Sequence, residues 1–122
     1  MALKRIRLEL ARTPEAPEGN PSCGYEFTAP LDSTGKLSLK QWMRDKDKCT
    51  VRRFWHSTTD EHGRLAHHHG GNWAFAWPGG QDREEPIFRF DKHAFVAGEY
   101  VSVTEHDGVE RPFRIVEVGP AT

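Results

Sequence analysis

Three consecutive histidines stand before a glycine pair in the segment GRLAHHHGGNWAFAWPGG, residues 63–80. Histidines two residues apart on a strand point to the same face, with Cα atoms about 6.5 to 7 Å apart. Two such imidazoles can bind one zinc-like ion at about 2.0 to 2.1 Å. The pair His67 and His69 therefore predicts two ligands of a zinc site. The candidates for a third ligand are His106, His56, His62 and His93.

The spacing of these candidates matches no established metal motif, because the chain has no HExxH, no CxxC pair and no second His-x-His. Histidines beside a glycine turn can also be polar hairpin residues without a metal. A two-residue turn at Gly70–Gly71 pairs residues whose numbers add to 141. This register predicts Ala66 opposite Phe75 on a core face and puts Leu65, His67 and His69 together on the other face.

Large aromatic residues follow the glycine pair at a spacing of two. Trp73 and Trp77 would share one face of a strand and line the interior of a small barrel. Such a lining can hold a small apolar or sugar ligand. The alternative is that both rings form the core itself, since a small domain needs its large side chains inside.

Positive charge is concentrated in residues 36–53, which carry a net charge of +5, whereas residues 54–122 carry −5. Lys46, Lys48, Arg52 and Arg53 could bind nucleic-acid phosphates while neighbouring aromatic rings stack on bases. However, Arg52 and Arg53 are adjacent on a predicted strand, so only one of them can face outward with its neighbours. A formal net charge of −1 for the whole chain also opposes non-specific nucleic-acid binding.

Catalytic motifs are not identifiable in the sequence. It contains no GxSxG nucleophile elbow, no P-loop and no dinucleotide-binding fingerprint. The acidic segment GGQDREEP is typical of a solvated loop rather than of a general acid and base pair. These observations favour a binding or interaction domain over an enzyme, with an unidentified protein partner or a small ligand.

Alternating apolar residues predict the elements that would position these side chains. Lys4–Leu10 is expected as a strand that buries Ile6, Leu8 and Leu10. One short helix is expected after Ser38, where Ser38 and Gln41 fit a capping box and the apolar residues Leu39, Trp42 and Met43 have helical spacing. In the last hairpin, a three-residue loop 106–108 with a left-handed Gly108 places Val101, Val103, Phe113 and Ile115 on one face.

The whole pattern predicts a mainly β protein in which 122 residues form a single domain. We expect a small barrel or sandwich of six to eight short antiparallel strands with one short helix, and an open α+β sheet is the alternative. The start, MALKRIRLEL, lacks the apolar run of a secretion signal, and no segment has the length of a membrane span. We therefore expect a cytoplasmic protein that does not bind membranes, with Cys23 and Cys49 reduced.

The phrases VRRFW, GEYVSVTEHDG and FRIVEV resemble parts of small bacterial β-rich proteins of unknown function. The resemblance covers most of the chain and implies a stand-alone bacterial domain. It implies no activity, cofactor, partner or site residue.

Overall fold

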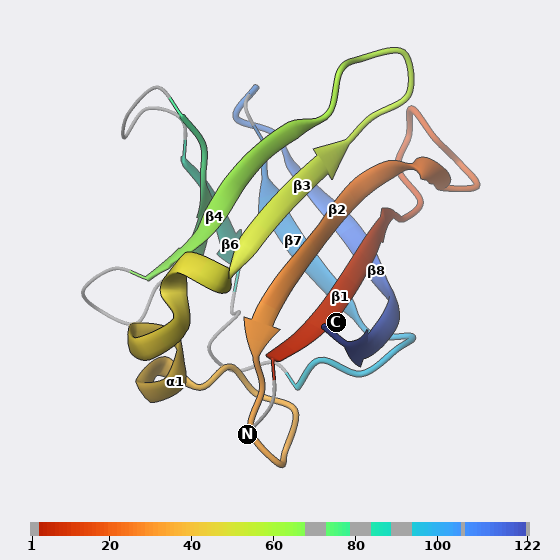
Figure 1. The fold of residues 1–122 in the computed structure, drawn as a ribbon. Helices are drawn as coiled ribbons and strands as arrows, with labels where there is room; N and C mark the ends of the chain where they lie inside the picture. The colour runs from red at the N-terminus through yellow and green to blue at the C-terminus, as the bar shows by residue number, and fades with distance from the viewer. Residues whose placement is uncertain (1–2, 68–72, 79–83, 89–93, 106, 122) are drawn as a thin grey trace.

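The structure is a computed structural model that describes residues 3–67, 73–78, 84–88, 94–105 and 107–121, with only the backbone described for 84–88. In this part of the chain eight strands form one antiparallel sheet (Figure 1). The strands are β1 (Leu3–Leu10), β2 (Asn20–Pro30), β3 (Thr50–Phe54), β4 (Glu61–His67), β5 (Trp73–Ala76), β6 (Glu84–Phe88), β7 (Tyr100–Thr104) and β8 (Glu110–Pro120).

Each strand pairs with the next one along the chain, and β8 pairs with β1. The sheet is therefore a closed up-and-down barrel, which confirms the mainly β prediction and removes the open α+β alternative. The short helix α1 (Leu39–Asp45) and the 3₁₀ turn η1 (Lys46–Lys48) connect β2 to β3 at one end of the barrel. No helix in the described ranges is both long and apolar enough to cross a membrane.

Inward-facing side chains fill the barrel. Ile6, Leu8 and Leu10 are buried on β1 as the alternation predicts. The ring of Tyr25 lies at the centre, stacked on Phe75 at 4.9 Å and edge-on to Phe113 at 5.2 Å. An eight-stranded barrel has an interior about wide enough for its own side chains, and the described rings pack together there as a core.

The last hairpin has the predicted register. Val101 pairs with Phe113, the amide of Glu105 donates to the carbonyl of Val109 at 3.0 Å, and Gly108 has a φ of 79°. This register is the one that the predicted three-residue loop requires, and the four predicted apolar residues of β7 and β8 are all buried. The prediction is confirmed because only this loop length puts both apolar sets on one face.

The predicted register of the histidine hairpin is wrong. Leu65 pairs with Phe75 and His67 with Trp73, so paired numbers add to 140 rather than 141. Leu65 and Phe75 are both buried, and their joint burial selects this register because a one-residue shift would turn Leu65 away from the core. The predicted turn at Gly70–Gly71 lies outside the described residues, which end at 67 and begin again at 73.

Helix α1 begins as predicted, with the Ser38 hydroxyl oxygen accepting from the Gln41 amide at 3.3 Å. The predicted apolar face is only partly correct. Trp42 packs edge-on to Trp73 at 5.6 Å and donates from Nε1 to the carbonyl of Leu65 at 3.0 Å. Met43, by contrast, is 63 % exposed, and Leu39 is also exposed. Trp42 and the buried Gln41 therefore attach this short helix to the barrel, because seven residues offer few contact positions.

The two cysteines are both buried and free. The pairing of β2 with β3 places Cys49 level with Ala29, six residues along β2 from Cys23. Six strand residues span roughly 20 Å, which is far beyond the reach of a disulfide.

Candidate functional site

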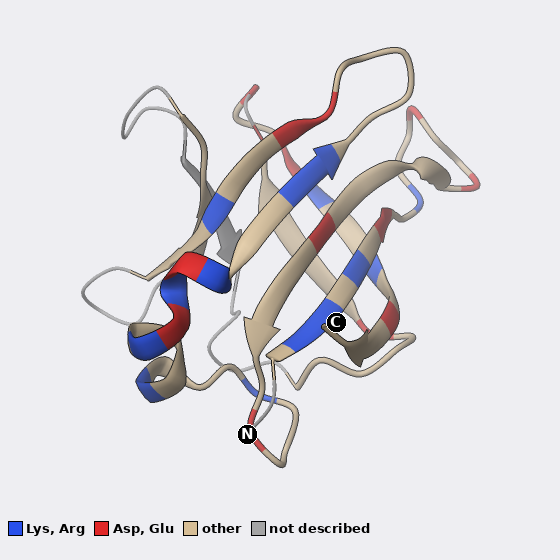
Figure 2. Cartoon of the chain, in the orientation of Figure 1, with Lys and Arg blue, Asp and Glu red and all other residues tan. Residues whose placement is uncertain are grey.

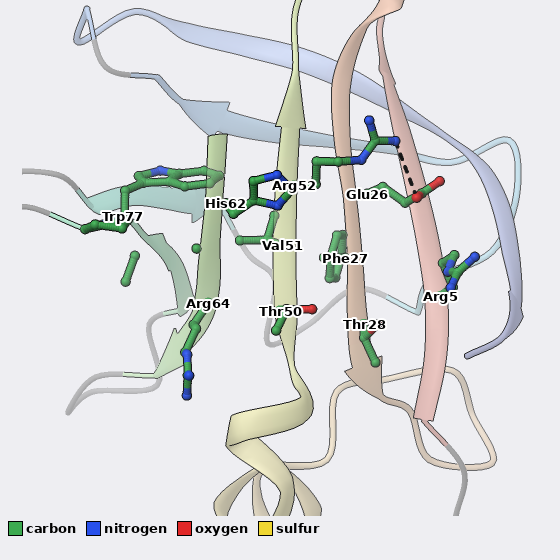
Figure 3. Close-up of a pocket in the computed structure, with 13 residues that line it drawn as sticks. Arg5, Glu26, Phe27, Thr28, Thr50, Val51, Arg52, His62, Arg64 and Trp77 are labelled. Atoms are coloured by element: carbon green, nitrogen blue, oxygen red, sulfur yellow. Dashed lines mark hydrogen bonds and ion pairs between the residues drawn. The ribbon is translucent and has the colours of Figure 1, made fainter. Parts of the chain in front are cut away.

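An open groove of about 680 Å³ lies on the outer face of the barrel over β1 to β5 (Figure 3). We call it the outer-face groove. It is lined by Arg5, Glu26, Phe27, Thr28, Thr50, Val51, Arg52, His62, Gly63, Arg64, Ala76, Trp77 and Pro78. Its polar side chains point away from the core because they alternate with buried residues such as Phe27 and Val51.

Two rows of polar side chains cross the groove from strand to strand. The first row consists of Arg5 opposite Thr28 and Thr50 opposite Arg64. The β2–β3 register, continued by one residue, places Thr28 opposite Thr50. With strands about 4.8 Å apart, the two arginines stand at Cα positions about 14 Å from each other, with two hydroxyls between them.

The second row is occupied by contacts within the protein. Arg7 and Arg52 flank Glu26, each with a 3.5 Å ion pair, and both guanidinium groups lie over the ring of Phe54 at 4.3 and 5.0 Å. Arg52 also donates to Asp60 at 2.8 Å, and this hydrogen bond raises the pKa of the arginine. Figure 2 shows the resulting alternation of basic and acidic segments across β1, β2 and β3.

The arginines of the first row form fewer ion pairs than those of the second row. Arg5 is exposed and forms no ion pair with any residue that the structure describes. Arg64 pairs only with Asp47 in that part of the chain, at 2.8 Å, and Asp47 is 89 % exposed. An exposed pair of this kind contributes about 0 to 1 kcal/mol, so an anionic ligand can compete for Arg64 at little cost.

A second polar cluster closes the other end of the barrel from α1. The side chain of Glu105 is 2 % exposed and accepts hydrogen bonds from the hydroxyl of Tyr25 at 2.7 Å, from Arg53 at 3.2 Å and from Arg111 at 3.1 Å. Burial disfavours the charged form of Arg53, but Tyr25 and Glu105 outweigh this effect and raise its pKa. We call these four residues the Glu105 cluster, and its dense pairing indicates a structural role.

The predicted nucleic-acid residues do not share one surface. Arg53 points into the barrel, where it belongs to the Glu105 cluster and stacks on Trp55 at 4.2 Å. Arg52 points outward into the groove, whereas Lys46 and Lys48 lie on η1, with the Lys46 ammonium 5.7 Å from the Trp42 ring. The structure therefore separates Arg53 from Arg52, as the alternation along this strand predicts.

The predicted metal residues are only partly described. His67 lies between Trp42 and Trp73, with ring centres at 6.0 and 4.6 Å, while His69 and His106 are outside the described residues. Among the residues that are described, no group of three or more potential ligands is placed to hold a metal ion. The zinc site stays a prediction.

Both predicted ligand-binding tryptophans are buried in the core. Trp73 packs against Trp42, and Trp77 packs near Phe75 and Tyr25 at 6.3 Å. This is the alternative that the sequence left open for them. Trp77 is also among the residues that line the outer-face groove, although only 4 % of it is exposed.

The sequence does not predict the first row of the groove, because its four residues lie on four different strands. Alternation along β1 places Arg5 outward, but nothing in the sequence shows which residues lie opposite it on β2, β3 and β4. No known protein family matches this chain, and no curated protein or solved structure matches it either.

Proposed function

We propose that the protein is a binding module that recognises an oxyanion, such as a phosphate, sulfate or carboxylate group, in the outer-face groove. The observation that carries the proposal is the first row, in which Arg5 and Arg64 stand on either side of Thr28 and Thr50 without a carboxylate between them. Guanidinium groups form charge-assisted, bidentate hydrogen bonds with oxyanions, and hydroxyls donate one more each.

The packing of the described core favours an external site. Aromatic rings from several strands contact one another inside the barrel, and the Glu105 cluster closes the end away from α1. The groove lies within the range of about 300 to 1,000 Å³ found for small-ligand sites. The strand pairing fixes the backbone positions of the four residues, so binding has to order the side chains but not the backbone.

The test is a titration of ¹⁵N-labelled protein with inorganic phosphate at low ionic strength, followed by amide shifts. We expect saturable shifts around the first row with a Kd in the millimolar range, equivalent to about 4 kcal/mol. Arg5→Gln and Arg64→Gln should each weaken binding about tenfold, because each removes a charge-assisted hydrogen bond of about 1.5 to 3 kcal/mol.

Two further variants make the test specific. Thr50→Val removes one hydroxyl while keeping the β-branched shape, and we expect a loss of about three- to fivefold. Arg114→Gln is the matched control, because Arg114 is an exposed strand arginine on β8 that does not line the groove. Equal losses for Arg114→Gln and Arg64→Gln would show a non-specific charge effect and would refute the site.

A further inference from the structure

The outer-face groove has an apolar end beside its basic row. The β4–β5 register places Arg64 opposite Ala76 and, continued by two residues, His62 opposite Pro78. Ala76 and the exposed Pro78 line this end of the groove together with the exposed His62, which Figure 3 labels on β4. We call Ala76, Pro78 and His62 the apolar shelf, and the buried Trp77 lies between Ala76 and Pro78 in the chain.

The apolar shelf is held rigidly. Gly63 lies directly beneath Trp77, and a Cβ built at Gly63 would stand 2.7 Å from Cε3 of that ring. The absence of a side chain at Gly63 therefore leaves room for the Ala76 carbonyl and for the buried indole of Trp77. The proline ring of Pro78 adds a second stiff element, since its φ is fixed. A rigid apolar surface loses little entropy when a flat group binds to it.

The distance between the two parts of the groove limits the ligand. Thr50 on β3 and Ala76 on β5 lie in the same cross-strand row, two strand spacings apart. This corresponds to about 10 Å between the oxyanion position and the apolar shelf. A bare phosphate or sulfate cannot contact both parts, whereas a phosphate ester with a planar ring at its other end can.

We infer that the ligand is an organic phosphate of the size of a nucleoside monophosphate, with its phosphate between Arg5 and Arg64 and its planar ring on the apolar shelf. This inference rests on the proposed function, because it uses the same first row for the phosphate. It adds the ring, the distance between the two groups, and His62 as the residue that distinguishes ligands. An imidazole face offers a stacking surface that accepts any planar base.

The experiment compares four probes by the same amide titration: inorganic phosphate, ribose 5-phosphate, adenosine 5′-monophosphate and adenosine. We expect the monophosphate to bind about tenfold more tightly than ribose 5-phosphate, which is the lower part of the range for one stacked base. Shifts near residues 62 and 76–78 should appear with the monophosphate and with adenosine, but not with the two probes that lack a base.

Variants separate the ring from the phosphate. His62→Ala should remove most of the tenfold advantage and leave the affinity for ribose 5-phosphate unchanged. His56→Ala is the control, because His56 is exposed in the β3–β4 loop and does not line the groove. Equal affinities for the monophosphate and ribose 5-phosphate would overturn the inference and leave the proposed function standing.

Two other outcomes would also overturn the inference. An advantage that survives His62→Ala would overturn the assignment of the ring to the apolar shelf. Failure of all three phosphate-bearing probes to shift the first-row amides would overturn the proposed function and this inference together. A thermal melt of His62→Ala, expected to match that of His56→Ala, shows that the variant is folded.

Discussion

Replacement of Glu105 by glutamine tests the Glu105 cluster directly. The substitution keeps the shape of the side chain and removes its charge. Arg53, only 14 % exposed, then loses its closest described carboxylate, and Glu61 at 3.7 Å is the one that remains among the described residues, whereas Arg111 keeps Asp107 at 2.9 Å. Glu105→Gln therefore leaves one buried guanidinium poorly compensated.

Removal of one partner from a buried ion pair costs about 3 to 5 kcal/mol of unfolding free energy. The remaining partners of both arginines, and the ability of glutamine to accept one hydrogen bond, favour the lower end. We expect a loss of about 3 kcal/mol, which corresponds to a fall in Tm of about 10 °C for a domain of this size.

Urea unfolding followed by tryptophan fluorescence measures this loss, with thermal melts as a second readout. Glu110→Gln is the matched control, because Glu110 is an exposed glutamate in the same hairpin, and we expect a change below about 0.5 kcal/mol. A double-mutant cycle with Arg53→Gln should give a coupling energy above about 1 kcal/mol. If Glu105→Gln unfolds at the same urea concentration as the control, the cluster does not stabilise the barrel.

Three further predictions concern other positions. Hydrogen bonds from Arg111 and from the Val109 amide lower the pKa of Asp107 to about 2, so its contribution to stability is present above about pH 4 and is lost between pH 4 and 2. Asp107→Asn should therefore flatten the pH dependence of Tm between pH 4 and 2, and an unchanged slope would contradict this prediction. Burial, with a smaller effect of the Asp45 charge, raises the pKa of Cys49 to about 11, so iodoacetamide at pH 8 should leave this thiol unmodified until urea unfolds the chain. Mass spectrometry measures the labelling, and rapid modification of Cys49 in the native protein would contradict the prediction. Gly63→Ala should lower the unfolding free energy by about 1 to 3 kcal/mol, because the added methyl group overpacks its surroundings. Gly119→Ala is the control, because Gly119 has open space around it, and equal urea midpoints for the two variants would disprove the packing argument.

The sequence predicted the fold where local signals agreed. In the last hairpin, the glycine at 108 and the alternation on both sides required the same three-residue loop, and the structure has it. In the histidine hairpin, the glycine pair suggested a two-residue turn, but the burial of Leu65 against Phe75 determined the register instead. A turn signal alone was weaker than the need to bury two large side chains.

The candidate site could not be predicted in the same way. Its residues are each ordinary outward positions on separate strands, and the groove exists only because the barrel places those strands side by side. The division between Arg52 and Arg53 was predictable from alternation, but the buried partner of Arg53 lies 52 residues away on the chain. Contacts between residues so far apart in the sequence depend on which strands are neighbours in the barrel, and the alternation of apolar residues along one strand does not show this.

The pairing of β1 with β8, which closes the barrel, determines where the chain can be cut without loss of the fold. Deletion of β1 would expose the backbone edges of β2 and β8 together with the apolar inner face, and an uncovered edge of this kind promotes aggregation. Joining the paired ends through a short linker and opening the chain in the loop of residues 55–60 would keep all eight strand pairs. Circular permutation should therefore be tolerated where truncation is not, because the barrel depends on the order of its strands around the ring.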